Sequence, residues 1–197
     1  MIKKINILLI LVSIIGSLYF VFTKDDNIIF ILKDLSIILT INGLYIIQKL
    51  FKIKINDGIN FIYIIFIFMA HFLGVICDLY TKIYWFDKFV HFLSGIVSSF
   101  AAIYILLKFK KNKNLFFDIL YIIAITLMIA SLWEVFEYLA SYYFNVDPQK
   151  VLLTGVNDTM SDIIVAFLGS ILVSISYYYE SKYNVNLLIK KFIKQIV

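Results

Sequence analysis

Long runs of apolar residues constrain this chain more than any other feature of its sequence. A helix needs roughly 20 predominantly apolar residues to cross the hydrocarbon of a bilayer, which is about 30 Å thick. The chain is 62% hydrophobic, which is more than the roughly half expected of a soluble domain. The sequence therefore predicts an all-α, polytopic integral membrane protein with about six transmembrane helices, at about residues 5–22, 29–48, 59–79, 88–107, 115–143 and 160–179.

The first two segments need interpretation. The first follows Lys3 and Lys4, as a signal peptide would, but its end, IGSLYFVFTKDD, has no small-x-small cleavage site, so we expect a retained helix. The second segment holds Lys33 and Asp34 near its start and begins either before or after them. With one Pro and seven Gly there is no sign of a second domain, and we expect a single transmembrane domain over residues 1–197.

The distribution of lysine predicts the orientation. All 18 basic residues are lysines. With a cytoplasmic N-terminus, 13 of them fall on the cytoplasmic side and four outside, with Lys33 unassigned. The positive-inside rule then places both termini in the cytoplasm of a multi-pass protein of the bacterial inner (plasma) membrane. Lysines placed in this way are topology signals and anchors to anionic membrane lipids, so no nucleic-acid partner is expected. Residues 186–197 are expected to form an amphipathic tail on the membrane surface.

Four predicted helices bring ionisable residues to the outer half of the membrane. They form pairs, each on one helical face: His71 and Asp78, Asp87 and His91, Glu134 and Glu137, and Asp158 and Asp162. Small residues let membrane helices pack closely, and small or hydroxylated residues continue three of these faces, so we expect the faces to contact one another. These residues are Ser94, Gly95, Ser98, Ser131, Ala166, Gly169 and Ser170.

Several ionisable residues also have a simpler structural interpretation. Asp87 and Asp158 lie at helix starts, where aspartate is a favoured N-cap. His71 fits a histidine satisfied by a serine or a carbonyl group. Asp78 and Asp118 lie near helix ends, where we expect them to be solvated.

Glu134 and Glu137 have no such simple interpretation. A charge near the middle of a membrane helix costs at least ~2.5–3.5 kcal/mol, and two on one face also repel each other. Lys33 is the only lysine within a predicted helix that we can pair with the six carboxylates of the set. Either several acids are protonated, the cavity is wet, or cations are bound.

A divalent metal ion accounts for this excess of negative charge. Metal sites in helix bundles are built from carboxylates and imidazoles that project from facing helices. A ligand set of His, Asp and Glu without Cys suits Zn, Mn or Fe, and we expect one or two ions. The predicted ligands are His71, Asp87, His91, Glu134, Asp158 and Asp162.

The segments YWFDKFVHFLSG, SLWEVFEY and GVNDTMSDIIVAFLGS resemble, in this order, the YjdF-like family of bacterial inner-membrane proteins, whose function is unknown. The resemblance covers about residues 70–172 and implies a polytopic helical fold without implying a reaction. The family pattern D-x-x-x-H-x-x-x-G, then W/Y-E-x-x-E, then D-x-x-x-D falls on Asp87, His91, Gly95, Trp133, Glu134, Glu137, Asp158 and Asp162.

The favoured function is a metal-dependent membrane hydrolase that acts on a lipid or lipid-linked substrate from the outer leaflet through metal-activated water. Glu137 and Glu134 are the predicted catalytic residues, with Glu137 as the general base. A redox di-iron enzyme fits the same residues. An ion-coupled transporter is the alternative, although there is no evident inverted repeat and the acids stop at mid-membrane. A non-catalytic cation-binding membrane partner is the third class. The absence of arginine removes one route to a bidentate phosphate clamp.

Overall fold

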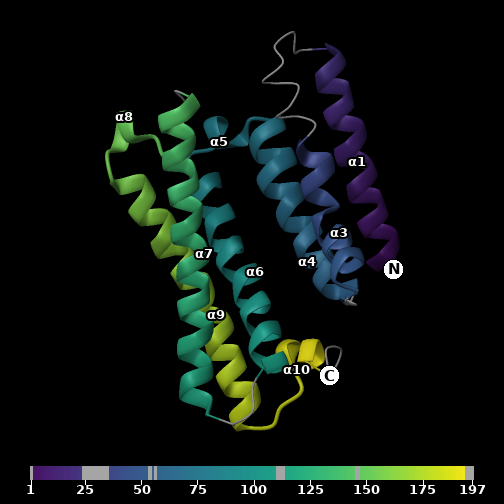
Figure 1. Ribbon diagram of the computed structural model, residues 1–197, viewed down its shortest axis with the longest axis vertical. Coiled ribbons are helices and arrows are strands. Elements are labelled where there is room, and N and C mark those ends of the chain that lie inside the picture. Colours follow the sequence, from purple (N-terminus) through teal and green to yellow (C-terminus); the bar gives the residue numbers. More distant parts are fainter. Residues whose placement is uncertain are drawn as a thin grey trace. The chain divides into compact units, whose positions relative to one another are not determined.

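All regular elements in the described part of the chain are helices in this computed structural model (Figure 1). The structure describes residues 2–23, 36–52, 55, 57–109, 114–144 and 147–193. The chain divides into two compact units, Met1–Phe86 (unit 1) and Asp87–Gln195 (unit 2). Each unit has its own packing.

Unit 1 is built on α1 (Ile2–Thr23), which packs against α4 (Asp57–Ile67) and η1 (Phe68–Ile76). Gly16 permits this approach, because a Cβ atom there would overlap the ring of Phe72. The other labelled helices of the unit are α3 (Gly43–Phe51) and α5 (Leu79–Lys82).

The helix that we predict over residues 59–79 changes its winding before it ends. From Phe68 to Ile76 it is a π-helix, and the Cys77 N–H donates to the Phe72 carbonyl at 2.9 Å, five residues back. Asp78 then takes a left-handed backbone conformation, with φ of 62°, and is exposed. The helix therefore stops at Ile76, and the exposure of Asp78 agrees with the solvated position that we expect for it.

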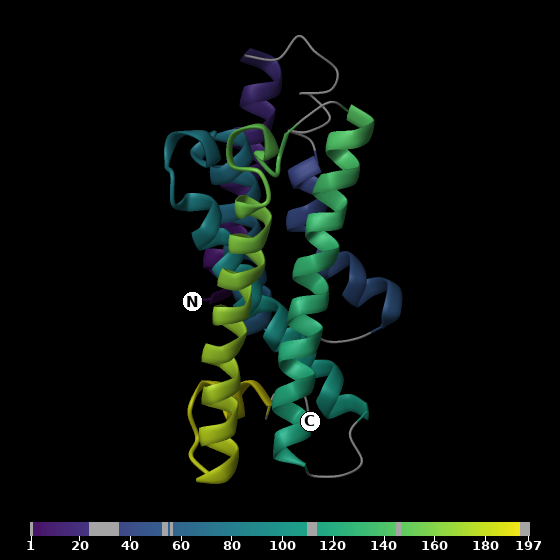
Figure 2. The ribbon, with the colours of Figure 1, turned by 90° about the vertical axis from the view of Figure 1, so that its left-hand side faces the viewer.

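The described residues of unit 2 form three long helices and two short ones. The long helices are α6 (Phe86–Phe109), α7 (Leu115–Phe144) and α9 (Asn157–Lys182). Helices α7 and α9 run antiparallel and side by side along most of their length (Figure 1 and Figure 2). The short α8 (Val151–Thr154) lies in the connection between them, and α10 (Leu188–Ile193) follows α9.

Small residues bring α6 and α9 into backbone contact. A Cβ atom at Gly95 would overlap the Ala166 backbone, and one at Gly169 would press on the Phe92 carbonyl. The prediction of close contact between these two faces is confirmed. The prediction for Ser131 is wrong, because that serine is exposed. The buried face of α7 is instead formed by residues spaced four apart: Asp118, Ile122, Thr126, Ala130 and Glu134.

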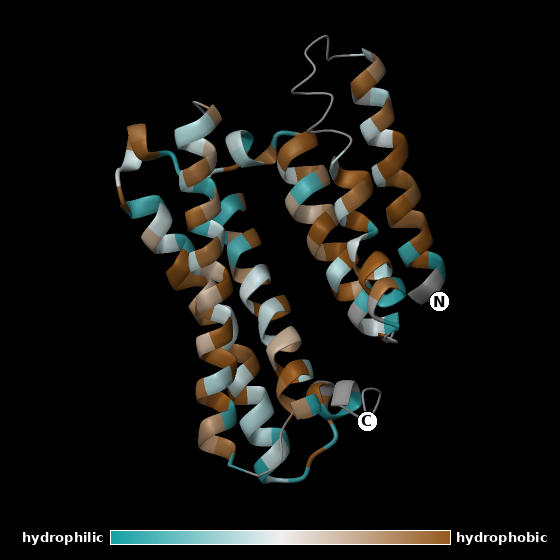
Figure 3. Ribbon diagram, viewed as in Figure 1, coloured by the Kyte–Doolittle hydropathy of each residue, from teal (hydrophilic) through white to brown (hydrophobic). Residues whose placement is uncertain are grey.

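Four described helices are long and apolar enough to cross a membrane. They are Lys4–Thr23, Phe86–Phe109, Leu115–Phe144 and Asn157–Lys182. Figure 3 shows apolar residues along most of α1, and hydrophilic residues in the first turns of α6 and α9. The helix Asn60–Ile76 is apolar but shorter. Of the segment predicted at 29–48, residues 29–35 lie outside the described part, and 36–48 are helical apart from a turn at Asn42. The structure thus supports four of the six predicted spans by length.

The end of unit 2 that carries the C-terminus of α9 also buries carboxylates. Asp118 is only 2% exposed and accepts a hydrogen bond from the Tyr177 hydroxyl at 2.9 Å. Our expectation that Asp118 is solvated is therefore wrong. The reason is that Asp118 lies on the buried face of α7 and not on its lipid-facing side.

Glu180 attaches the C-terminal helix to this end. Its carboxylate is 1% exposed and accepts backbone N–H groups from Leu187, Ile189 and Lys190 at 2.7 to 3.2 Å. These donors are the first amides of α10, which have no partner within the helix. The tail predicted at 186–197 thus contains a short helix at Leu188–Ile193, held by a buried carboxylate, while residues 194–197 lie outside the described part.

Candidate functional site

The first turns of α6 and α9 bring three potential metal ligands together. Asp87 and His91 lie on one face of α6, four residues apart, and Asp162 lies on the face of α9 that packs against it. His91 Nε2 is 3.6 Å from Asp87 Oδ1 and 3.9 Å from Asp162 Oδ1. One ligand atom from each of these residues lies within 4.8 Å of the other two. The side chains are 2–13% exposed, so the cluster is largely shielded from solvent.

Lys88 joins the cluster from α6. Its ammonium group contacts Asp158 Oδ1 at 2.5 Å and the two Asp162 carboxylate oxygens at 2.9 and 3.0 Å. It therefore bridges the two aspartates that begin α9. The N-cap residue of α9 is Val156, so Asp158 lies within the first turn and is not the cap that we considered; its carboxylate pairs with Lys88.

Lys150 reaches the cluster from the connection between α7 and α9. Its ammonium group is 2.5 Å from Asp87 Oδ2 and 3.7 Å from Asp158 Oδ2. Burial lowers the pKa of Lys150, but the hydrogen bond to Asp87 and the charges of Asp87 and Asp158 raise it further, so its pKa lies above the ordinary value. Lys150 is therefore a cation at neutral pH.

Asp147 shapes the loop that presents Lys150. Its two carboxylate oxygens accept the N–H groups of Val151 at 2.8 Å and Leu152 at 3.1 Å. Lys150 itself has a left-handed backbone, with φ of 52°. The turn thus directs consecutive side chains, Gln149 and Lys150, onto the acidic residues of the three long helices.

Glu134 lies beside the cluster with one carboxylate oxygen unpaired. It is 5% exposed, and Gln149 Nε2 donates to its Oε2 at 3.2 Å and to its backbone carbonyl at 3.0 Å. Its Oε1 is buried and has no hydrogen-bond partner among the described residues. Thr159 of α9 also interacts with the Glu134 carboxylate as a hydrogen-bond donor, and the charges of Asp158 and Asp87 act on it. A buried carboxylate oxygen without a partner is unusual and costly, which makes it a candidate for a further ligand atom.

Glu137 lies one turn further along α7 and is less buried than Glu134. Its Oε1 accepts a hydrogen bond from Trp133 Nε1 at 2.9 Å. It also interacts electrostatically with Glu134, Asp87 and Asp162. The Trp133 indole N–H therefore orients the Glu137 carboxylate.

His71 belongs to unit 1, where both of its ring nitrogens have partners. Ser36 Oγ lies 3.0 Å from Nε2, and Thr40 Oγ1 lies 3.0 Å from Nδ1. This arrangement is the histidine satisfied by hydroxyl groups that we considered as the simpler interpretation. Both nitrogens that could ligate a metal are engaged, so we leave His71 out of the proposed ligands.

The two lysines correct our charge argument. From the sequence we compared six carboxylates with Lys33 alone, and Lys33 lies outside the described residues. Lys88 and Lys150 both carry their ammonium groups into the cluster, since a lysine stem is long enough to leave a helix end or loop and reach an acid. Asp87, Glu134, Glu137, Asp158 and Asp162 still outnumber them by five carboxylates to two cations. The negative excess is thus smaller than we expected but remains.

Lys88, Lys150 and Gln149 are the site residues that sequence reasoning missed. Both lysines were interpreted as topology signals because they fall on the outer side of the predicted topology. The available signal for Lys88 was its position between Asp87 and His91. For Lys150 and Gln149 there was no periodic signal, because they lie in an irregular turn.

The long apolar helices and the buried ionic cluster define a helical integral membrane protein. The chain matches the family model described as "Predicted membrane protein (DUF2238)" over residues 5–182, and it belongs to this family. The family is one of unknown function, and the YjdF-like resemblance agrees with it. No curated protein and no solved structure matches the chain.

Proposed function

We propose that the chain is a metal-dependent membrane enzyme whose divalent ion is held by Asp87, His91 and Asp162. The observation that carries the proposal is the convergence of three ligand atoms from two helices within 4.8 Å. An imidazole and two carboxylates, without a thiolate, suit Zn, Mn or Fe. Glu134 would supply a fourth ligand through its unpaired Oε1 atom.

The two lysines are consistent with such a site. Lys88 and Lys150 occupy the carboxylates that a metal ion would use, and their side chains are about one-third exposed. Flexible lysine stems can rotate away when a divalent ion takes their place, because the ion satisfies the same oxygens with a higher charge. Metal binding is then an exchange of cations and does not create a new buried charge.

We propose hydrolysis of a lipid or lipid-linked group as the reaction. A bound divalent ion would lower the pKa of a water molecule and polarise the scissile bond. Glu137 would accept the proton of that water as general base, held in position by the Trp133 indole N–H. The site lies near one end of three candidate membrane spans, where the headgroup of a membrane lipid would have access.

Elemental analysis of the detergent-purified protein tests the metal. We expect about one equivalent of a transition metal in the wild type and loss of it in His91→Ala and Asp162→Asn. Asp118→Asn is the matched control, because Asp118 is an equally buried aspartate of unit 2 outside the cluster. A wild-type protein without metal after growth in metal-replete medium, or equal metal content in all four proteins, would contradict the proposal.

A cation-coupled transporter is the second candidate, and one observation favours it. Buried acids are not confined to one end of unit 2, because Asp118 lies near the other end of α7. Backbone contact at Gly95 and Ala166 separates the two groups of acids, however, and leaves no open path between α6 and α9. Proton or cation flux in proteoliposomes that is abolished by both Asp162→Asn and Asp118→Asn would favour transport over the enzyme.

A further inference from the structure

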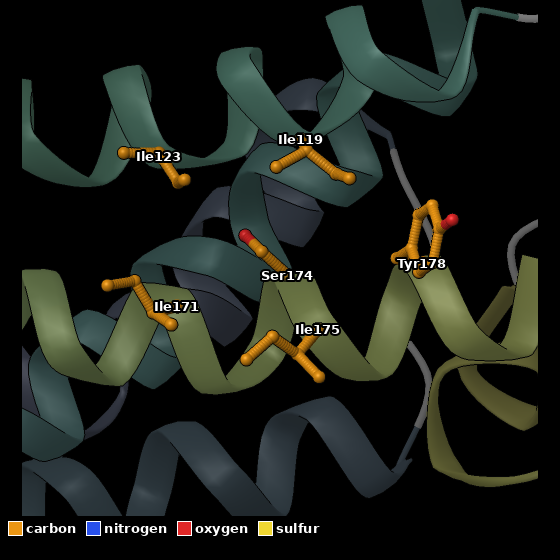
Figure 4. Close-up of a pocket in the computed structure, with 6 residues that line it drawn as sticks. All are labelled: Ile119, Ile123, Ile171, Ser174, Ile175 and Tyr178. Carbon is orange, nitrogen blue, oxygen red and sulfur yellow. The ribbon is translucent and has the colours of Figure 1, made fainter.

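A groove lies between α7 and α9, away from the ionic cluster. It has a volume of about 200 Å³ and is lined by Ile119, Ile123, Ile171, Ser174, Ile175 and Tyr178 (Figure 4). Four isoleucines give it an almost entirely hydrocarbon surface. Both helices are candidate membrane spans, so the groove opens toward the acyl chains of the bilayer.

The groove exists because a serine separates larger residues. Ser174 lies between Ile171 and Ile175 on α9 and is 3% exposed. A larger side chain there would fill the space between the two helices. Its hydroxyl has no hydrogen-bond partner among the described residues. The small size of the Ser174 side chain therefore leaves the groove open.

A polar end adjoins this apolar groove. Lys182 is the last residue of α9, and its ammonium group donates to the Tyr178 hydroxyl at 2.7 Å and lies 5.1 Å from the centre of that ring. Ser174, Tyr178 and Lys182 are four residues apart, so they follow one face of the helix with a rise of about 6 Å per step. This face of α9 therefore leads from the apolar groove at Ser174 to the Lys182 ammonium group at the end of the helix.

This order of groups matches the order of groups in a membrane phospholipid. The isoleucines present hydrocarbon at the depth of acyl chains, Tyr178 a hydroxyl at the depth of the interface, and Lys182 a cation beyond it. Lys190 and Lys191 of α10 also lie near this end of unit 2, so the surroundings favour an anionic headgroup over a zwitterionic one.

We propose that the groove and the Tyr178–Lys182 pair bind one anionic phospholipid. One acyl chain lies along the isoleucines, and the phosphodiester accepts hydrogen bonds from the Tyr178 hydroxyl and the Lys182 ammonium group. The inference does not depend on the proposed metal site, which lies near the other end of these helices.

Native mass spectrometry of delipidated, detergent-purified protein tests the inference. Phosphatidylglycerol and phosphatidylcholine with the same acyl chains are added in separate titrations. We expect the wild type to bind one phosphatidylglycerol roughly tenfold more tightly than phosphatidylcholine, because both lipids offer the same phosphodiester but the trimethylammonium group of phosphatidylcholine is repelled by the Lys182 ammonium group. Lys182→Gln should remove this preference, and Ile175→Trp, which covers the groove, should weaken both lipids.

Two matched variants serve as controls. Lys108→Gln removes an exposed lysine of α6 at the same end of unit 2 but outside the groove, and should keep the preference for phosphatidylglycerol. Ile164→Trp introduces the same indole at another lipid-facing position of α9, where Ile164 is 50% exposed, and should keep both affinities. Equal affinity of the wild type for the two lipids, or equal loss in each variant and its control, would overturn the inference.

Discussion

Both ends of unit 2 bury carboxylates, but these carboxylates have different kinds of partners at the two ends. At the end of Asp118 and Glu180, the donors are neutral: the Tyr177 hydroxyl donates to Asp118 Oδ2, and three backbone amides donate to Glu180. At the end of Asp87 and Asp162, five acids lie around two lysines and a histidine, so charged side chains provide the partners.

This difference distinguishes acids that stabilise the fold from acids that can bind a further cation. A buried carboxylate with dedicated donors is already stabilised, and any ligand would have to displace those donors. A cluster with more acids than cations can accept another cation. On this basis Asp118 and Glu180 have a structural role, and the cluster of Asp87, His91 and Asp162 is the place where we propose the metal ion.

The structural role of Glu180 predicts the largest effect. In Glu180→Ala the three amides of Leu187, Ile189 and Lys190 lose their acceptor, so α10 should detach from α9. Hydrogen exchange at these amides should accelerate by roughly 100-fold, which corresponds to the loss of about 3 kcal/mol of local stability. Glu180→Gln keeps an uncharged acceptor and should show a smaller change. Unchanged exchange in Glu180→Ala would mean that this carboxylate does not hold the tail.

Removal of a counter-cation should sharpen the difference between the two ends. In Lys150→Met the cluster loses a positive charge 2.5 Å from Asp87. Affinity for Mn²⁺ should then rise by roughly tenfold, because the partly exposed cation competes for the same oxygens and its repulsion is screened by solvent. Titration calorimetry checks this, with Lys108→Met as the control. Weaker binding of Mn²⁺ would show that Lys150 organises the site and does not compete with the metal.

Asp118 should affect stability without affecting the metal. Asp118→Asn keeps the shape of the side chain but weakens the bond from the Tyr177 hydroxyl, and the unfolding free energy should fall by about 1 kcal/mol. Denaturant titration in mixed micelles measures this fall. Metal content should equal that of the wild type. A variant that lost metal would remove the distinction between the two ends.

The positions of the long helices and the faces on which they meet could be predicted from the sequence. Apolar length identified α1, α6, α7 and α9, and residue spacing placed Asp87 with His91 and Asp158 with Asp162 on common faces. Gly95, Ala166 and Gly169 further indicated which faces meet. These features are periodic, so a helix model alone is enough to derive them.

The contacts of flexible side chains and of irregular turns could not be predicted from the sequence. The direction of the Lys150 side chain depends on a left-handed turn that Asp147 stabilises, and no periodicity indicates it. The π-helix around His71 and the burial of Asp118 likewise depend on packing against other helices. The cations of the site were missed for this reason, whereas its anions were found.

The smallest effect on stability is expected at Glu137, where the largest effect on function is proposed. Glu137 is only partly buried, and its hydrogen bond from Trp133 lies at the surface of the helix, so Glu137→Gln should change the unfolding free energy by less than about 0.5 kcal/mol. Metal content should stay the same, because Glu137 lies outside the cluster of Asp87, His91 and Asp162. Growth of a deletion strain complemented with each variant provides the functional measurement. Loss of complementation with metal retained would identify Glu137 as the base, and Trp133→Phe, which removes only the orienting N–H, should then lie between Glu137→Gln and the wild type. Full complementation by Glu137→Gln would remove Glu137 from the mechanism and leave the cluster as a cation-binding site without a base.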